Sequence, residues 1–125
     1  MSTIHIIEPD AAILGGLIEL LSSLQLPVCG HTSPAQFLAA DHDNSGGFLV
    51  VDFDARDGAD FDFLKRLRER DISMPTVLIS SNADNAFKAR ALNAGAIDVI
   101  DKPFVNDILL ARIRQYLPEV NQSPH

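Results

Sequence analysis

The sequence predicts one α/β domain in which five parallel strands form a sheet covered by helices on both faces. Apolar runs of strand length alternate with segments of helical period, and this rhythm is typical of a parallel sheet built from βα units. Two of the runs, Phe48–Val51 and Thr76–Ile79, are almost unbroken, as expected for strands buried on both faces. The chain has 125 residues, 46% of them hydrophobic, which fits a single compact core.

The first two βα units are predicted from the N-terminal third. Ile4–Ile7 is the first strand, and Leu26–Gly30 is a short second strand. The helix between them has apolar residues at three- and four-residue steps, namely Ile13, Leu14, Leu17, Leu20, Leu21 and Leu24. The second helix should begin at Pro34, with Ser33 as N-cap, and run through Ala40. A polar turn follows.

The other three units follow the same alternation. The strands are expected at Phe48–Asp52, at Thr76–Ser80 after Pro75, and at Ile97–Ile100. The helices are expected at about Phe61–Arg70, from Asp84 as N-cap to near Gly95, and at Asp107–Leu117 before Pro118. The domain should therefore cover residues 1–120, and residues 121–125 should be a frayed tail.

Three of the predicted strands are followed by a reactive polar side chain. Asp52 ends the third strand, Ser80 ends the fourth, and Lys102 comes just after the fifth. Open α/β sheets build their sites at the carboxyl ends of parallel strands. We therefore expect the carboxylate, the hydroxyl and the ammonium to converge at one edge of the sheet.

Composition argues against several classes of function. The formal net charge of -7 opposes direct nucleic-acid binding, which depends on clustered Lys and Arg. No apolar run approaches the roughly 20 residues needed to cross a bilayer, and no signal peptide is recognisable, so we expect a cytoplasmic protein without membrane contact. The single cysteine, Cys29, should be a small buried hydrophobe. Four dispersed histidines show no ligand spacing, so no zinc site is expected, and His5 should pack in the core.

Three segments together resemble the receiver domain of two-component response regulators, and the resemblance spans nearly the whole chain. The segments are Leu49–Asp52, Val77–Ser81 and Ala94–Phe104. The last is the most specific, because it combines an Ala-Gly-Ala turn, a short strand and Lys-Pro-Phe. The resemblance implies a doubly wound, flavodoxin-like (βα)5 sheet with strand order 2-1-3-4-5.

The resemblance also implies a chemical role for the three polar side chains. Asp52 would accept a phosphoryl group from a histidine kinase or a phosphotransfer protein, and Lys102 would stabilise the negative charge that builds up on phosphorus. Ser80 would hydrogen-bond a phosphoryl oxygen and move when Asp52 is modified. In this family the bond that matches Lys102–Pro103 is typically cis. Such a domain is a signalling module and not a turnover enzyme.

The expected magnesium site departs from the family pattern. Receivers usually have two adjacent acids after the first strand, whereas this chain has Glu8 and Pro9. Proline brings no side-chain ligand for Mg²⁺, which demands oxygen ligands in near-octahedral geometry. Glu8 is the favoured substitute, together with Asp52 and the main-chain carbonyl of Asp54. Asp10 is a further candidate, although it is better placed to cap the first helix.

Two readings of the function therefore stay open. In the first, phosphorylation of Asp52 switches contacts with an effector domain, a partner protein or a second copy of the chain. In the second, the domain is a degenerate receiver that binds its partners independently of phosphate. The second reading draws support from Pro9, from Ala55, Arg56, Asp57 and Asp60 in the loop after Asp52, and from Val99 in place of the usual switching aromatic.

Overall fold

A computed structural model describes residues 3–40, 47–52, 59–81 and 83–117. Five parallel strands form one sheet in the order β2-β1-β3-β4-β5, so the predicted fold class and strand order are confirmed. The strands are β1 Ile4–Ile7, β2 Val28–His31, β3 Phe48–Asp52, β4 Thr76–Ser80 and β5 Asp98–Asp101. The helices are α1 Ala11–Ser22, α2 Pro34–Ala39, α3 Ala59–Glu69, α4 Asn85–Asn93 and α5 Asn106–Arg114.

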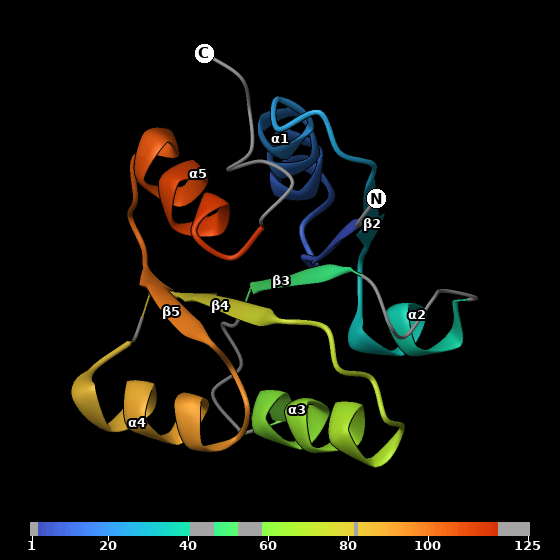
Figure 1. The fold of residues 1–125 in the computed structure, drawn as a ribbon, viewed down its shortest axis with the longest axis vertical. Coiled ribbons are helices and arrows are strands. Elements are labelled where there is room, and N and C mark those ends of the chain that lie inside the picture. Colours follow the sequence, from blue (N-terminus) through green and yellow to red (C-terminus); the bar gives the residue numbers. More distant parts are fainter. Residues whose placement is uncertain (1–2, 41–46, 53–58, 82, 118–125) are drawn as a thin grey trace.

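The sheet lies between two helical layers. Figure 1 shows α1 and α5 on one face, and α2, α3 and α4 on the other. Side chains alternate between these layers along β1: Ile4 and Ile6 belong to the core under α1 and α5, whereas Ile7 belongs to the core on the other side. This alternation follows from the two-residue period of a strand. It also places His5 on the same side as α2, where it is buried.

Capping residues set several helix starts, as the sequence predicted. The Asp10 side chain accepts hydrogen bonds from the backbone N–H groups of Ala12 and Ile13 at the start of α1. Ser33 caps α2 and Asp84 caps α4 in the same way. Gly95 forms the turn before β5 with a φ of 118°, a conformation that glycine adopts without a steric penalty.

Some predictions at the edges of elements were wrong. β2 runs from Val28 to His31, two residues later at its start than predicted, because Leu26 and Pro27 still belong to the connection from α1. Cys29 is exposed and not buried, since it lies on the edge strand. The helix α5 already ends at Arg114. The predicted tail, residues 121–125, lies outside the described residues, and none of the described helices is long and apolar enough to span a membrane.

Candidate functional site

The polar residues at the strand ends come together at the carboxyl edge of the sheet. In the parallel register Asp52 lies opposite Ile79, and Ser80 lies opposite Asp101. Lys102 follows directly, and its backbone N–H donates to the Ser80 carbonyl at 2.9 Å. Asp52 and Ser80 are both buried. The strands therefore bring Asp52, Ser80 and Lys102 to the same edge of the sheet.

Asp52 and Lys102 form a close ion pair. The Lys102 Nζ donates to Asp52 Oδ1 at 2.7 Å and lies 2.5 Å from Oδ2. The Asp52 side chain is only 3% exposed and that of Lys102 23%. Removing one partner of such a pair leaves the other charge uncompensated in a poorly solvated place, which is far more costly than breaking a surface pair. The Lys102–Pro103 peptide bond is cis, as the resemblance implied.

Glu8 is a second buried carboxyl group beside Asp52. Burial raises the pKa of Glu8 to about 7, and a hydrogen bond with Asp52 adds to the rise, because only the protonated acid can donate to a carboxylate. The Glu8 Oε1 accepts from the Asp10 backbone N–H at 3.1 Å. In the ionised form, Oε2 is a buried oxygen for which the described residues offer no donor.

Glu8 and Asp52 fit the needs of a divalent cation better than the other candidates. A buried, under-coordinated oxygen next to a second carboxylate is what Mg²⁺ uses as a protein ligand, with water and phosphate oxygens completing its shell. Asp10 is exposed and its side chain caps α1, so Glu8 remains the favoured substitute. Asp54 and the loop residues 55–57 lie outside the described residues.

A cleft opens next to the ion pair. It is lined by Asp52 and Lys102 on the polar side, and on the apolar side by Ile13, Leu17 and Phe104 among others. On the other side of the lysine, a second hollow includes Ser81, Asp84 and Asp101. The ion pair is thus reachable from solvent, although its carboxylate is almost fully covered. A small phosphorylated group could approach Asp52 from this edge.

Two further arrangements escaped the sequence analysis. Asp98 on β5 binds Arg112 on α5 through two hydrogen bonds of 2.8 and 2.5 Å, and Tyr116 donates to the same carboxylate at 3.1 Å. Burial alone would raise the pKa of Asp98, but the hydrogen bonds and charge of Arg112, together with hydrogen bonds from the Val99 backbone N–H and Tyr116, outweigh it and lower the pKa. The second arrangement gathers two histidines and a cysteine on β1 and β2. The first depends on how α5 packs beside β5, and the second depends on the register of β1 and β2.

The model of the response regulator receiver domain matches residues 4–114, which is most of the chain. The chain belongs to this family. It is therefore a receiver domain of the kind found in two-component response regulators, and its family members are signalling phosphoacceptors that generally bind Mg²⁺ at the phosphorylation site. Receiver domains interact with histidine kinases and effector domains.

Curated relatives support the same assignment for this receiver domain. It is 29% identical over 113 residues to the transcriptional regulatory protein FixJ of Rhizobium meliloti, covering 90% of this chain and 55% of that protein. It is 32% identical over 116 residues to the response regulator protein TodT of Pseudomonas putida, covering 93% of this chain and 51% of that protein. The chain thus spans about half the length of the curated relatives that it matches.

Solved structures share the fold of this receiver domain. The crystal structure of FixJ-N superposes with a TM-score of 0.78 at 25% identity, covering 100% of this chain and 98% of the other. A CheY-like receiver domain protein from Methanospirillum hungatei superposes with a TM-score of 0.76 at 24% identity, covering 98% of each chain. The fold is thus common to receivers whose sequences differ widely.

Proposed function

We propose that Asp52 accepts a phosphoryl group from the phosphohistidine of a kinase or a phosphotransfer protein. The observation that carries this proposal is the buried Asp52 carboxylate held by the Lys102 ammonium at the carboxyl edge of the sheet. A carboxylate is a competent nucleophile, and an adjacent fixed cation stabilises the negative charge of a transferring phosphoryl group. An ion pair with only a structural role would not need the neighbouring cleft.

The transfer makes one bond and breaks one bond. An Asp52 carboxylate oxygen attacks phosphorus in line with the leaving histidine nitrogen, an O–P bond forms, and the N–P bond breaks with its electron pair returning to the imidazole ring. The Lys102 ammonium would interact first with the Asp52 carboxylate and then with the phosphoryl oxygens that take up the negative charge. Bound Mg²⁺, held by Glu8 and Asp52, would supply further charge neutralisation.

Ser80 is the proposed hydroxyl switch. It is buried at the end of β4, and its carbonyl is tied to the Lys102 backbone. A phosphoryl group on Asp52 adds acceptor oxygens close to this strand end, which favours a conformation in which the Ser80 hydroxyl donates to one of them. Val99 is buried on the neighbouring β5 and offers no ring for an aromatic switch. Ser80 and the segment after it would then carry the signal.

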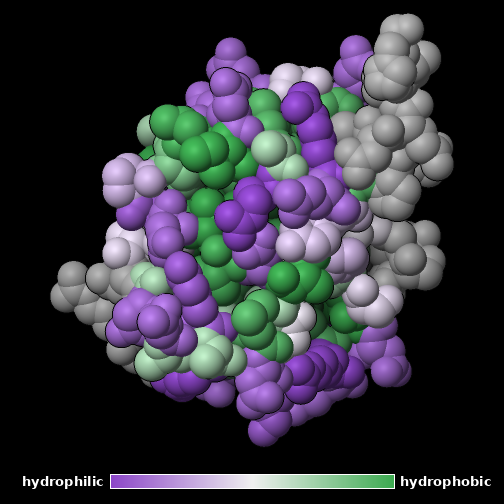
Figure 2. All heavy atoms as spheres, turned by 60° about the vertical axis from the view of Figure 1, so that its left-hand side comes forward, coloured by the Kyte–Doolittle hydropathy of each residue, from purple (hydrophilic) through white to green (hydrophobic). Residues whose placement is uncertain are grey.

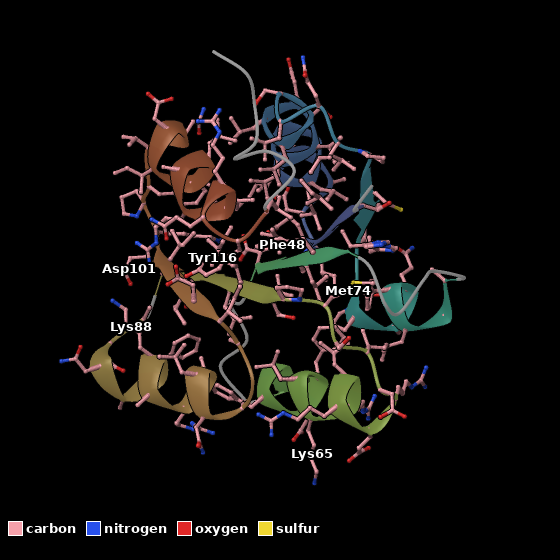
Figure 3. All side chains as sticks on the ribbon, viewed as in Figure 1. Phe48, Lys65, Met74, Lys88, Asp101 and Tyr116 are labelled. Atoms are coloured by element: carbon pink, nitrogen blue, oxygen red, sulfur yellow. The ribbon has the colours of Figure 1, made fainter. Side chains whose placement is uncertain are left out.

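The face formed by α4, β5 and α5 is the proposed place for contact with a second receiver, an effector domain or a partner protein. Figure 2 turns this side of the molecule forward, where hydrophobic and hydrophilic surfaces alternate. Exposed apolar residues on these helices and their connection include Leu92, Val105 and Ile108. Lys88 and Asp101 point toward each other across this face at 3.1 Å (Figure 3). Such exposed pairs contribute little to stability, so they are free to be exchanged for contacts with a partner.

The alternative is a degenerate receiver that binds partners without phosphate. Its specific support is Pro9, which cannot replace the second acid of the usual magnesium site. In this alternative the Asp52–Lys102 pair would only keep the edge of the sheet in shape. The two functions differ in a direct way, because only the first requires a covalent adduct on Asp52.

Intact mass spectrometry after incubation with acetyl phosphate tests the proposal. We expect one phosphoryl adduct in Mg²⁺, a much smaller amount with a chelator, and none in Asp52→Asn. Asp101→Asn is the matched control, because this carboxylate also ends a strand at the same edge but is 58% exposed; it should be labelled like the wild type. Unmodified wild-type protein under all conditions, or an adduct that survives Asp52→Asn, would overturn the assignment in favour of the degenerate receiver or of another acceptor.

A further inference from the structure

Two histidines and the only cysteine meet on the α2 side of β1 and β2. His5 on β1 lies opposite Cys29 on β2, and Ile7 lies opposite His31. Because Cys29 and His31 are two residues apart on one strand, their side chains point to the same face. The same-face neighbours across the strand pair are therefore His5, Cys29 and His31, although 26 residues separate the two histidines.

The spacing of the ligand atoms suits a small, softer metal ion. The His5 Nδ1 and His31 Nε2 atoms share a hydrogen bond of 3.2 Å, and with the Cys29 sulfur all three atoms lie within 4.8 Å of one another. Two nitrogens at about 2.0–2.1 Å from a tetrahedral zinc ion would be about 3.4 Å apart, and a nitrogen and a thiolate about 3.6 Å. The histidine nitrogens already have nearly this separation. A bound ion would replace the hydrogen bond between them, with loss of its proton and a turn of the rings, and the cysteine side chain would move closer.

The two imidazole rings are held by the hydrogen bond between them and by packing. They stack on each other with centroids 5.4 Å apart, and both meet the edge or face of the buried Phe37 ring at 5.3 and 5.4 Å. Both histidines are buried, whereas Cys29 is exposed. The cluster thus has two preorganised nitrogen ligands and one adjustable sulfur ligand at the solvent side, where an ion can enter.

We propose that His5, Cys29 and His31 form a zinc site, with a water molecule or a ligand from outside the chain as the fourth donor. Nitrogen and thiolate ligands favour zinc over Mg²⁺, which prefers oxygen. This site differs from the acidic one in both place and chemistry, because it lies on the face of the β1–β2 pair. A bound ion would crosslink the edge strand β2 to β1.

A backbone hydrogen bond connects the site to the acidic edge. The Glu8 backbone N–H donates to the His31 carbonyl at 3.0 Å, so the strand pair that carries the zinc ligands also supports Glu8. Fixing β1 against β2 would therefore restrain the backbone that presents Glu8 to Asp52. The proposal itself does not depend on phosphorylation of Asp52, and a non-phosphorylated receiver would bind zinc equally well.

Calorimetric titration of the 125-residue chain with Zn²⁺ tests the site, with Co²⁺ as a spectroscopic probe. We expect one ion per chain and a thiolate-to-cobalt absorption band. Cys29→Ala should abolish the band and weaken Zn²⁺ binding at least ~100-fold, more than the loss of an outer-shell partner costs. This variant should fold normally, because Cys29 is exposed. Asp52→Asn is the control for binding at the acidic edge.

A second measurement keeps the proposal testable if the buried histidines tolerate substitution poorly. Zn²⁺ should slow the alkylation of Cys29 by iodoacetamide at least ~10-fold in the wild type, because the coordinated thiolate is no longer available. Zinc affinity that is unchanged in Cys29→Ala, or that disappears in Asp52→Asn, would overturn the proposal. Equal alkylation rates with and without Zn²⁺ would also overturn it.

Discussion

The strand β1 takes part in two polar regions of opposite character. At its carboxyl end, Glu8 lies beside Asp52, which binds Lys102. Three residues earlier, His5 packs against His31 and Phe37 on the face of the sheet. The first region offers carboxylate oxygens and an ammonium, which suit Mg²⁺ and phosphate, whereas the second offers imidazole nitrogens and a thiol. Strand ends and strand faces of one sheet can therefore host separate chemistries.

The two regions also differ in how their buried polar groups are stabilised in the folded protein. At the edge, the Asp52 and Lys102 charges compensate each other, while Glu8 is held with a pKa of about 7 because ionisation would bury an additional charge. On the face, the two imidazole rings are held by the hydrogen bond between them and by aromatic packing against Phe37. We therefore expect the carboxyl edge, with Glu8, Asp52 and Lys102, to respond mainly to changes of charge. The β1–β2 face, with His5 and His31, should respond mainly to changes in packing.

The largest expected effect is the loss of the ammonium at the edge. Lys102→Ala should slow phosphoryl labelling of Asp52 by roughly 10²–10³-fold, as for other removals of a group that stabilises transition-state charge. Time-resolved intact mass with acetyl phosphate measures it. Lys88→Ala is the matched control, because Lys88 is 39% exposed and pairs with Asp101 instead. Equal labelling rates for both variants would mean that Lys102 has only a structural role.

Replacing Glu8, the second carboxyl group at the carboxyl edge, should make the free energy of unfolding of the metal-free protein less dependent on pH. The folded-state pKa of Glu8, about 7, is higher than its ordinary value of 4.5. Between these values the folded chain binds more protons than the unfolded chain, so the contribution of Glu8 to stability falls as pH rises. Glu8→Gln should therefore gain up to about 2–3 kcal/mol relative to the wild type between pH 5 and pH 8.

Urea unfolding at both pH values in a chelator checks this prediction. Glu19→Gln is the control, since Glu19 is exposed on α1 and should give the same difference from the wild type at pH 5 and pH 8. If Glu8→Gln also shows a constant difference, Glu8 is ionised in the folded protein at both values. The edge would then carry more uncompensated charge than the geometry indicates.

The edge could be predicted from the sequence because its residues occupy strand ends. Asp52, Ser80 and Lys102 each follow an apolar run, and parallel strands bring their carboxyl ends together whatever lies between them. The caps Asp10 and Ser33 were equally visible, because a capping side chain acts on the backbone only two or three residues away. The roles of Asp52, Ser80, Lys102 and Glu8 remain predictions.

The face could not be predicted, because it depends on which residues lie opposite each other across strands. The His5–Cys29 pairing follows from the register of β1 and β2, and a shift of one residue would turn Cys29 to the other face. The predicted start of β2 was two residues too early, which shows how little the sequence fixes this edge strand. The Asp98–Arg112 pair likewise depends on how α5 packs beside β5. No local pattern encodes either contact.

A substitution that alters the packing against His5 and His31 should affect zinc binding on the β1–β2 face without affecting phosphoryl labelling of Asp52 at the carboxyl edge. Phe37→Leu keeps an apolar side chain but removes two aromatic contacts with the histidine rings, each worth about 0.5–1.5 kcal/mol. We expect a loss of about 1–2 kcal/mol in the free energy of unfolding and a Zn²⁺ affinity about 10-fold weaker. The rate of Asp52 labelling should not change. A slower rate would show that the two regions are coupled through β1.

The smallest expected effect is that of Cys29→Ser in the absence of metal. Because the thiol is exposed and lies on an edge strand, its replacement should change the free energy of unfolding by less than about 0.5 kcal/mol. Thermal unfolding of the wild type and of Cys29→Ser should be measured with a chelator and with excess Zn²⁺, so that the effect of zinc on the unfolding temperature can be compared between the two proteins. Zinc should raise the unfolding temperature of the wild type, since a ligand that binds only the folded state stabilises it, and should leave Cys29→Ser nearly unchanged. An equal rise in both proteins would place the bound ion at the carboxylates of the edge, and the separation between the two regions would be lost.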